Sequence, residues 1–158
     1  MSTTEETHQP PADVHELLQR IDESWSDFLD AIDGISDERM EEPGVAGEWS
    51  VKNLLGHIAF WEERASGHIE RALAGLPDEE SDEVVEGLNA ADHEARQGRS
   101  LSEERAALHR AHAAVTELLE SVEGLDATAL DEAIRWDTYQ HYAEHAPGIR
   151  EWRRRSGV

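Results

Sequence analysis

Apolar residues recur every three or four positions through most of the chain, on a background of charged residues. This spacing places apolar side chains along one face of an α-helix. The clearest stripe is formed by Val14, Leu18, Ile21, Trp25, Phe28 and Ile32. Pro10 and Pro11 precede this stripe and Gly34 follows it, so the pattern predicts a helix over residues 12–33.

Similar stripes predict three more long helices. One is expected over residues 50–75, with Ser50 as its N-cap, and another over residues 101–123. The last is expected over about residues 134–154. It contains Pro147, which has no amide hydrogen to donate and is therefore expected to kink or split this helix.

The segments between these stripes are rich in glycine, proline and acidic residues. A weakly apolar stretch over residues 84–96 predicts a short helix inside the long crossover region. Residues 1–11 show no apolar pattern and are expected to form a disordered acidic tail. No segment alternates with period two, so no strand is expected. The sequence therefore predicts an all-α protein, a single four-helix bundle domain over residues 12–155.

The charge of the chain excludes two classes of partner. It has 36 Asp and Glu against 14 Lys and Arg, for a formal net charge of -22 at pH 7. No basic surface is available to bind nucleic acid or to dock on an anionic membrane. No apolar run reaches the ~18 residues of a membrane-spanning helix, and the polar N-terminus does not resemble a secretory signal. We therefore expect a cytoplasmic protein.

The excess of acidic residues also affects how the stability of the protein depends on salt. Lys52 is the only lysine in the chain. Excess like charge destabilises a compact chain, unless salt at ~1 M shortens the screening length to about 3 Å. The composition resembles that of proteins from salt-accumulating halophiles. Two other interpretations stay open, namely a merely solvated acidic surface and a docking face for a basic partner.

Histidine is the residue type through which this chain can bind a transition metal, because it has nine histidines and no cysteine. His141 and His145 are spaced i,i+4, so both rings lie on one helix face, in register with Ile149 and Trp152. A third ligand must come from another helix, and His57, which borders the apolar stripe of the second long helix, is the best candidate. Three imidazoles with one open position are typical of catalytic zinc sites and also suit nickel, iron or cobalt.

The other histidines are less informative. An H-x-x-x-H pair alone is a weak signal, since helical surfaces often carry one by chance. His112 lies close to the apolar seam of the third long helix and is either a rival third ligand or a core histidine. The remaining five are expected at the surface, and they are His8, His15, His68, His93 and His109.

Two runs of residues resemble motifs of a known family. Residues 47–63 read G-E-W-S-V-K-N-L-L-G-H-I-A-F-W-E-E, which resembles the start of the second helix in DinB-like proteins. Residues 137–152 read D-T-Y-Q-H-Y-A-E-H-A-P-G-I-R-E-W, which resembles the closing segment of the ClbS/DfsB-type branch of that superfamily. The resemblance spans roughly residues 12–154.

The resemblance implies a four-helix bundle that is often a homodimer. In many members a histidine of the second helix and an H-x-x-x-H pair of the last helix bind a divalent metal, and by position these are His57, His141 and His145. The superfamily includes transferases and isomerases that use low-molecular-weight thiols, and a colibactin-resistance hydrolase. The resemblance therefore implies a metal-dependent thiol transferase, isomerase or hydrolase acting on a small molecule. Its metal would be Zn, Ni or Fe, with a low-molecular-weight thiol as a candidate cosubstrate.

Residues close to these histidines supply further candidates. Glu62 and Glu144 are candidates for a general base or for an acceptor of an imidazole N–H, although both also suit solvated surface carboxylates. Trp49, Trp61 and Tyr142 are expected to line a pocket or to fill the core. A function of a different class stays open, namely a metal-free helical bundle that binds or sequesters a small molecule without catalysis.

Overall fold

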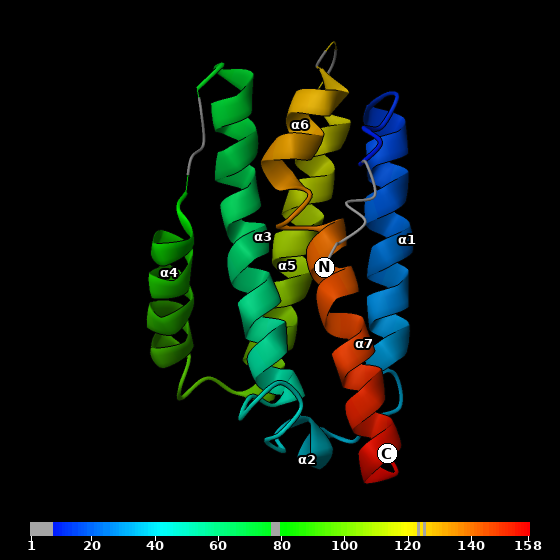
Figure 1. Cartoon of the computed structure of the whole chain (residues 1–158), viewed down its shortest axis with the longest axis vertical. Coiled ribbons are helices and arrows are strands. Elements are labelled where there is room, and N and C mark those ends of the chain that lie inside the picture. The colour runs from blue at the N-terminus through cyan, green and yellow to red at the C-terminus, as the bar shows by residue number, and fades with distance from the viewer. Residues whose placement is uncertain (1–7, 77–79, 123, 125) are drawn as a thin grey trace, which may run out of the picture.

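The computed structural model describes residues 8–76, 80–122, 124 and 126–158, and these residues form seven α-helices (Figure 1). Four helices are long, namely α1 (Val14–Ile32), α3 (Val51–Leu73), α5 (Leu101–Glu120) and α7 (Tyr139–Ser156). Three are shorter, namely α2 (Asp37–Met40), α4 (Asp82–Ala95) and α6 (Ala127–Ile134). The described residues contain no strand, only an isolated bridge between Ala46 and Trp49. The predicted all-α class is confirmed.

The long helices stand side by side and enclose an apolar core (Figure 1). α3 packs chiefly against α5, and α1 packs chiefly against α7. The inward stripes supply the core, since Phe28, Ile58, Val115 and Ile149, one from each long helix, are all 0% exposed. Burial of apolar surface stabilises the bundle by about 25 cal/mol per Å² removed from water. No helix in the described part of the chain has the length and apolar character needed to cross a membrane.

Ser50 is confirmed as the N-cap of α3. Its hydroxyl accepts a hydrogen bond from the Asn53 amide, and the Asn53 side chain accepts one from the Ser50 amide. This reciprocal capping box satisfies two amides that the first turn of a helix leaves without partners. It determines where α3 begins, about two turns before His57.

The fourth predicted helix is interrupted, but not at Pro147. α6 ends at Ile134 and α7 begins at Tyr139, and Thr138 has a non-helical backbone between them. The Thr138 hydroxyl donates to the Ile134 carbonyl over 2.8 Å, which satisfies a carbonyl at the end of α6. The expected split at Pro147 is therefore wrong, and the chain breaks about ten residues earlier.

Pro147 lies inside α7, which continues through it to Ser156. Proline removes the hydrogen bond that the carbonyl of Ala143 would otherwise accept. Both Ala143 and Pro147 are exposed, so water can hydrate that carbonyl. The helix tolerates the proline because the lost bond faces solvent rather than the core.

α4 lies outside the four-helix bundle, alongside α3 (Figure 1). It confirms the predicted short helix in the crossover region, and none of its residues is buried. Trp61 Nε1 donates to Asn89 Oδ1 over 2.7 Å, and Arg96 donates to Glu104 Oε1 over 3.0 Å. These polar contacts hold α4 against the bundle.

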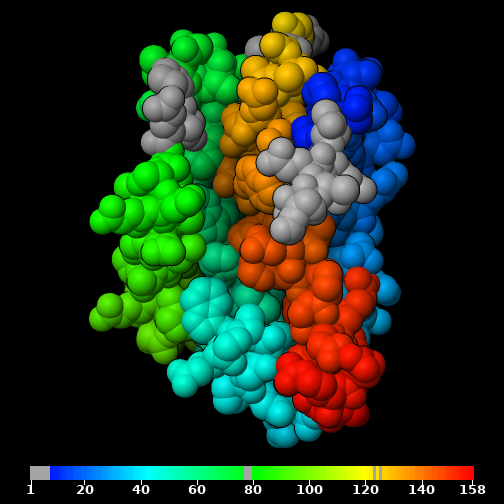
Figure 2. Space-filling view, in the orientation of Figure 1, coloured from blue at the N-terminus to red at the C-terminus, as the bar shows by residue number. Residues whose placement is uncertain are grey.

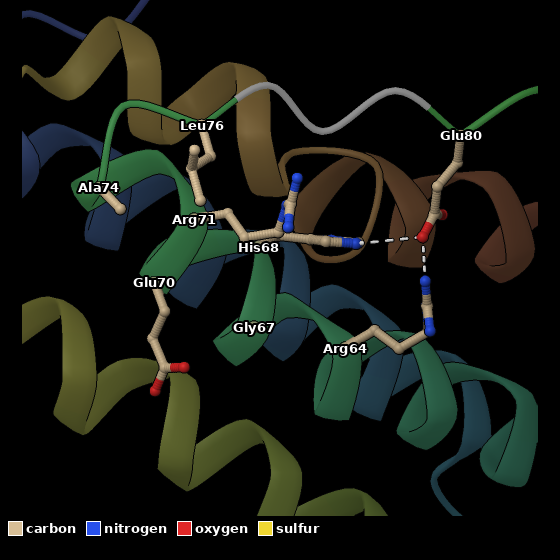
Figure 3. Close-up of a pocket in the computed structure, with 8 residues that line it drawn as sticks. All are labelled: Arg64, Gly67, His68, Glu70, Arg71, Ala74, Leu76 and Glu80. Carbon is tan, nitrogen blue, oxygen red and sulfur yellow. Dashed lines mark hydrogen bonds and ion pairs between the residues drawn. The ribbon is translucent and has the colours of Figure 1, made fainter.

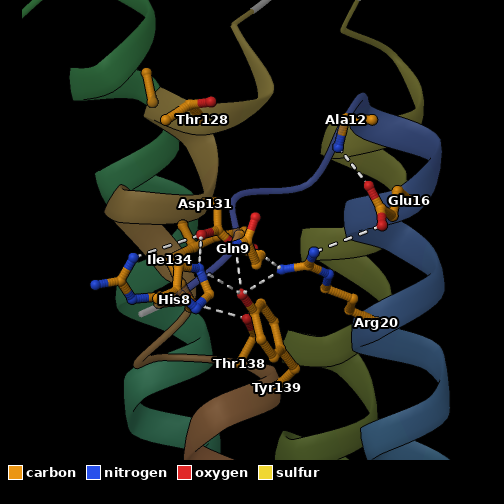
Figure 4. A network of polar contacts seen from close by, with 12 residues as sticks. His8, Gln9, Ala12, Glu16, Arg20, Thr128, Asp131, Ile134, Thr138 and Tyr139 are labelled. Carbon is orange, nitrogen blue, oxygen red and sulfur yellow. Dashed lines mark hydrogen bonds and ion pairs between the residues drawn. The ribbon is translucent and has the colours of Figure 1, made fainter. Parts of the chain in front are cut away.

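The expected disordered tail lies partly outside the described residues, which begin at His8. In the described part, His8 Nε2 lies 2.6 Å from Asp131 Oδ2, and Arg20 donates to the Gln9 carbonyl over 2.8 Å (Figure 4). Tyr139 also donates to Asp131, whose side chain is buried. His8 and Gln9 therefore contact α6 and α1, while the disorder expected for the tail stays a prediction.

Candidate metal centre

The three histidines predicted as ligands converge on one point. His57 comes from α3, and His141 and His145 come from the first half of α7. His141 Nε2 lies 3.0 Å from His57 Nε2 and 3.0 Å from His145 Nε2. One ring nitrogen of each residue lies within 4.8 Å of those of the other two.

Burial keeps these three rings neutral. It lowers the pKa of His57 to about 4, and electrostatic interactions with His145 and Arg96 lower it further. It lowers the pKa of His141 well below the usual value, and the two neighbouring histidines act in the same direction. The pKa of His145 is also lowered by burial, against an opposing effect of Glu144. Neutral imidazoles offer the lone pairs that a metal ion requires.

The cluster fits a divalent ion better than it fits a hydrogen-bonded trio. Nε2 of a neutral imidazole has either one hydrogen or one lone pair, so the two contacts of His141 cannot both be well-aligned hydrogen bonds. Ligand nitrogens around a tetrahedral ion with bonds of ~2.0–2.1 Å lie about 3.3–3.4 Å apart. The separations of 3.0 Å in the cluster are close to that value. His57, His141 and His145 can therefore hold a metal ion.

A cavity of about 510 Å³ opens beside the cluster. Its walls come from α3, α4 and the α6–α7 region, and Figure 2 shows the surface hollowed between α4 in green and the start of α7 in orange. Trp61 lines this cavity, as expected. Trp49 instead packs at an angle against the His57 ring, with ring centroids 5.2 Å apart and ring planes at 67°. Tyr142 is 0% exposed and belongs to the core.

The two candidate carboxylates lie in different surroundings. Glu144 is exposed and lines the cavity beside the cluster. Glu62 is 0% exposed, and its Oε1 lies 3.1 Å from His112 Nδ1, while its Oε2 has no hydrogen-bond partner. Burial raises the pKa of Glu62 to about 7, and the hydrogen bond to His112 opposes this shift.

His112 lies outside the three-histidine cluster. Its ring stacks on Trp25, with centroids 3.7 Å apart and planes 6° from parallel. Its Nδ1 is also 3.1 Å from the Tyr142 hydroxyl. Of the two alternatives, the structure favours a core histidine over a rival ligand.

His68 was expected at the surface, and the structure corrects this. It is only 8% exposed, and its Nδ1 lies 2.5 Å from Oδ2 of Asp137, which is 5% exposed. His68 follows His57 by eleven residues, or about three helical turns, so both lie on one face of α3. That spacing is the signal by which the sequence could have placed His68 near the same cavity.

Of the other four histidines expected at the surface, His15 and His109 are exposed, while His8 and His93 are half-buried. The ring of His93 stacks on Trp49, with centroids 4.5 Å apart. The predicted surface position is therefore confirmed for His15 and His109.

A second cavity, of about 640 Å³, lies along the C-terminal half of α3 (Figure 3). Arg64, Arg71, His68 and Glu80 line it, and Arg64 forms an ion pair with Glu80. His68 and Glu80 also line the cavity beside the cluster, so the two cavities meet there. The second cavity is larger, but the histidine cluster opens into the smaller one.

Comparison with known proteins places the chain among helical bundles. It matches the DinB superfamily over residues 5–148. An uncharacterised protein from Escherichia coli UTI89 is 18% identical with a TM-score of 0.74, over 94% of this chain and 97% of that one. An uncharacterised protein from Clostridium difficile 630 is 14% identical with a TM-score of 0.73, over 92% and 98% respectively.

A protein from Streptococcus pneumoniae is 16% identical with a TM-score of 0.69, over 94% of this chain and 92% of that one. At such identities these similarities show the fold alone. No functionally curated protein matches the chain.

Proposed function

Because the chain belongs to the DinB superfamily, we propose that His57, His141 and His145 bind a divalent metal ion through which the protein acts on a small molecule. The observation that carries this proposal is the convergence of three neutral imidazoles from two helices, of which His141 is buried and the other two are half-buried. An open cavity beside them supports a role beyond structure. Three nitrogen ligands suit zinc, nickel or iron.

The proposed activity is that of a metal-dependent thiol transferase, isomerase or hydrolase. A bound ion would lower the pKa of a water or thiol, or polarise a carbonyl group. The chain has no cysteine, so a reacting thiol would belong to a low-molecular-weight cosubstrate. The sequence of residues 137–152 supports membership of the ClbS/DfsB-type branch.

The residues of the chain have distinct parts in this proposal. Glu144 lines the cavity and its charge acts on His145, so it is the candidate general base. Trp61 forms part of the cavity wall. Glu62 contacts His112 in the bundle interior, and we assign it no direct part in the chemistry.

Metal analysis tests the proposal directly. Protein purified without a histidine tag should contain one equivalent of divalent metal, and isothermal titration of metal-free protein with Zn²⁺ should give a stoichiometry of one. His57→Ala and His141→Ala should each weaken Zn²⁺ binding at least about 100-fold, because two nitrogens bind a metal far less tightly than three. His15→Ala, which changes an exposed histidine on α1, is the matched control. Equal affinities in all four proteins would contradict the proposed site.

A further inference from the structure

The cavity beside the histidine cluster is rich in carboxylates. Its described lining includes Glu80, Asp82, Asp137 and Glu144, and it includes no lysine or arginine. Such a wall favours positive charge and disfavours negative charge in any molecule that enters.

Two of these carboxylates are already engaged by basic side chains. Glu80 forms an ion pair with Arg64, as Figure 3 shows. His68 lies between the two carboxylates. Its Nε2 is 3.6 Å from Glu80 Oε1 and its Nδ1 is 2.5 Å from Asp137 Oδ2. Glu80 and Asp137 are therefore less available to a ligand than a carboxylate without such partners.

Asp82 and Glu144 are in a different position. Asp82 lies in the first turn of α4, and Glu144 lies on α7 directly before His145. Both are exposed, both line the cavity, and neither forms an ion pair within the described part of the chain. The cavity thus carries two uncompensated carboxylates on two different helices.

Two indole rings add to this preference for cations. Trp61 and Trp136 line the same cavity. The guanidinium carbon of Arg64 lies 5.4 Å from the Trp61 ring centroid, and that of Arg135 lies 5.8 Å from the Trp136 centroid. Trp136 is 62% exposed and can also offer its ring to a ligand. Aromatic faces attract ammonium groups through their quadrupole.

We propose that this cavity selects a small molecule that carries a positively charged group, such as an ammonium. The negative charge of Asp82 and Glu144 attracts that group into the cavity, while the reactive end of the molecule lies at the three-histidine cluster. This inference rests on the proposed metal site and names the class of substrate that the site accepts. An anionic molecule of the same size meets the same two carboxylates and is rejected.

The test uses metal-anchored thiols whose tails differ in charge. Co²⁺ replaces the native metal, and its visible spectrum reports thiolate binding. The probes are thiocholine with a cationic tail, mercaptoethanol with a neutral tail, and mercaptoethanesulfonate with an anionic tail. Because the three thiols differ in acidity, the quantity compared is the change in the Kd of each probe between protein variants, in which acidity cancels.

Removal of the two carboxylates should affect the probes in opposite directions. In Asp82→Asn/Glu144→Gln, the Kd of thiocholine should rise about five-fold and that of mercaptoethanesulfonate should fall by a similar factor. The Kd of mercaptoethanol should stay unchanged. Circular dichroism at the KCl concentration used establishes that each variant is folded.

The matched control removes two exposed carboxylates elsewhere. Asp22→Asn/Glu120→Gln makes the same change in net charge, on α1 and α5, away from the cavity lining. It should leave all three Kd values unchanged. An unchanged thiocholine Kd in the cavity variant, or an equal shift for all three probes, would overturn the charge selection and leave the metal proposal intact. A protein that binds no Co²⁺ would overturn both.

Discussion

At the scale of single residues, Glu62 is the clearest case of a group whose surroundings change its chemistry. It comes from a helix that also carries His57, yet its side chain is 0% exposed and contacts His112. Burial raises its pKa to about 7, against an ordinary value of 4.5. The folded protein therefore binds the Glu62 proton more tightly than the unfolded chain does.

This difference predicts how stability depends on pH. As pH rises from about 4.5 to 7, the unfolded chain has already released the proton that the folded state retains, so the Glu62 contribution to the unfolding free energy falls by at most about 3 kcal/mol. Glu62→Gln should remove this fall. Urea denaturation of metal-free protein from pH 5 to pH 8 should show the variant gaining stability relative to the wild type.

The neighbouring histidines change stability with the opposite sign. The lowered pKa of His57 makes the unfolding free energy rise as pH increases from about 4 to 6.5. The wild type and Glu62→Gln share this effect, so it cancels in the difference between their unfolding free energies. Glu120→Gln, at an exposed position, is the control. Parallel pH profiles for the wild type and Glu62→Gln would show that Glu62 is not held in its neutral form.

At the scale of helices, α3 and α5 approach closely because position 56 has no side chain. A Cβ added to Gly56 would collide with Glu104 Oε2 and come within 2.9 Å of Arg96 Cδ. Glu104 is 2% exposed and accepts from Arg96 and Arg99 over 3.0 and 2.6 Å. The absence of a side chain at Gly56 thus leaves space for the ion pair between Arg96 and Glu104, which connects the end of α4 to α5.

Two substitutions on the same helix should therefore act in opposite directions. Gly67→Ala, where the added Cβ meets no atom within 4 Å, should stabilise the protein by about 1 kcal/mol because alanine favours helix. Gly56→Ala should destabilise it by about 2 kcal/mol, since it displaces a buried carboxylate from its partners. Urea denaturation measures both. Stabilisation by both substitutions would mean that Glu104 moves aside at little cost.

At the scale of the whole molecule, the net charge of -22 is the dominant feature. Arginines oppose the repulsion among the acidic residues by linking helices. Arg150 of α7 donates to Asp27 of α1, and Arg153 of α7 donates to the Ala31 carbonyl of α1. A surface ion pair such as that of Arg150 with Asp27 contributes about 0–1 kcal/mol. We expect such pairs to offset only a small part of the repulsion among so many acidic residues.

The stability of the protein should therefore rise with salt. At ~0.01 M the screening length is about 30 Å, and at 1 M it is about 3 Å, so repulsion across the molecule acts only at low salt. The urea midpoint should increase steadily from 0.01 to 1 M KCl. Urea is uncharged, so KCl alone sets the ionic strength. A midpoint independent of KCl would contradict this prediction.

The local features of this protein follow from its sequence alone. The period of the apolar residues placed the long helices, because each helical turn depends on residues three or four positions apart. The i,i+4 spacing placed His141 and His145 on one face for the same reason. The addition of His57 needed family motifs as well, since no local rule relates residue 57 to residue 141.

The pairing of groups distant in sequence was decided only by the tertiary structure. His68 with Asp137 and Glu62 with His112 are 69 and 50 residues apart in the chain. Each contact depends on how α3 is rotated against its neighbours, which is settled by packing of the whole core. The sequence pattern also did not predict the interruption between α6 and α7. Pro147 is the stronger local signal, but its lost hydrogen bond faces solvent, whereas the chain turns where Thr138 can bond the end of α6.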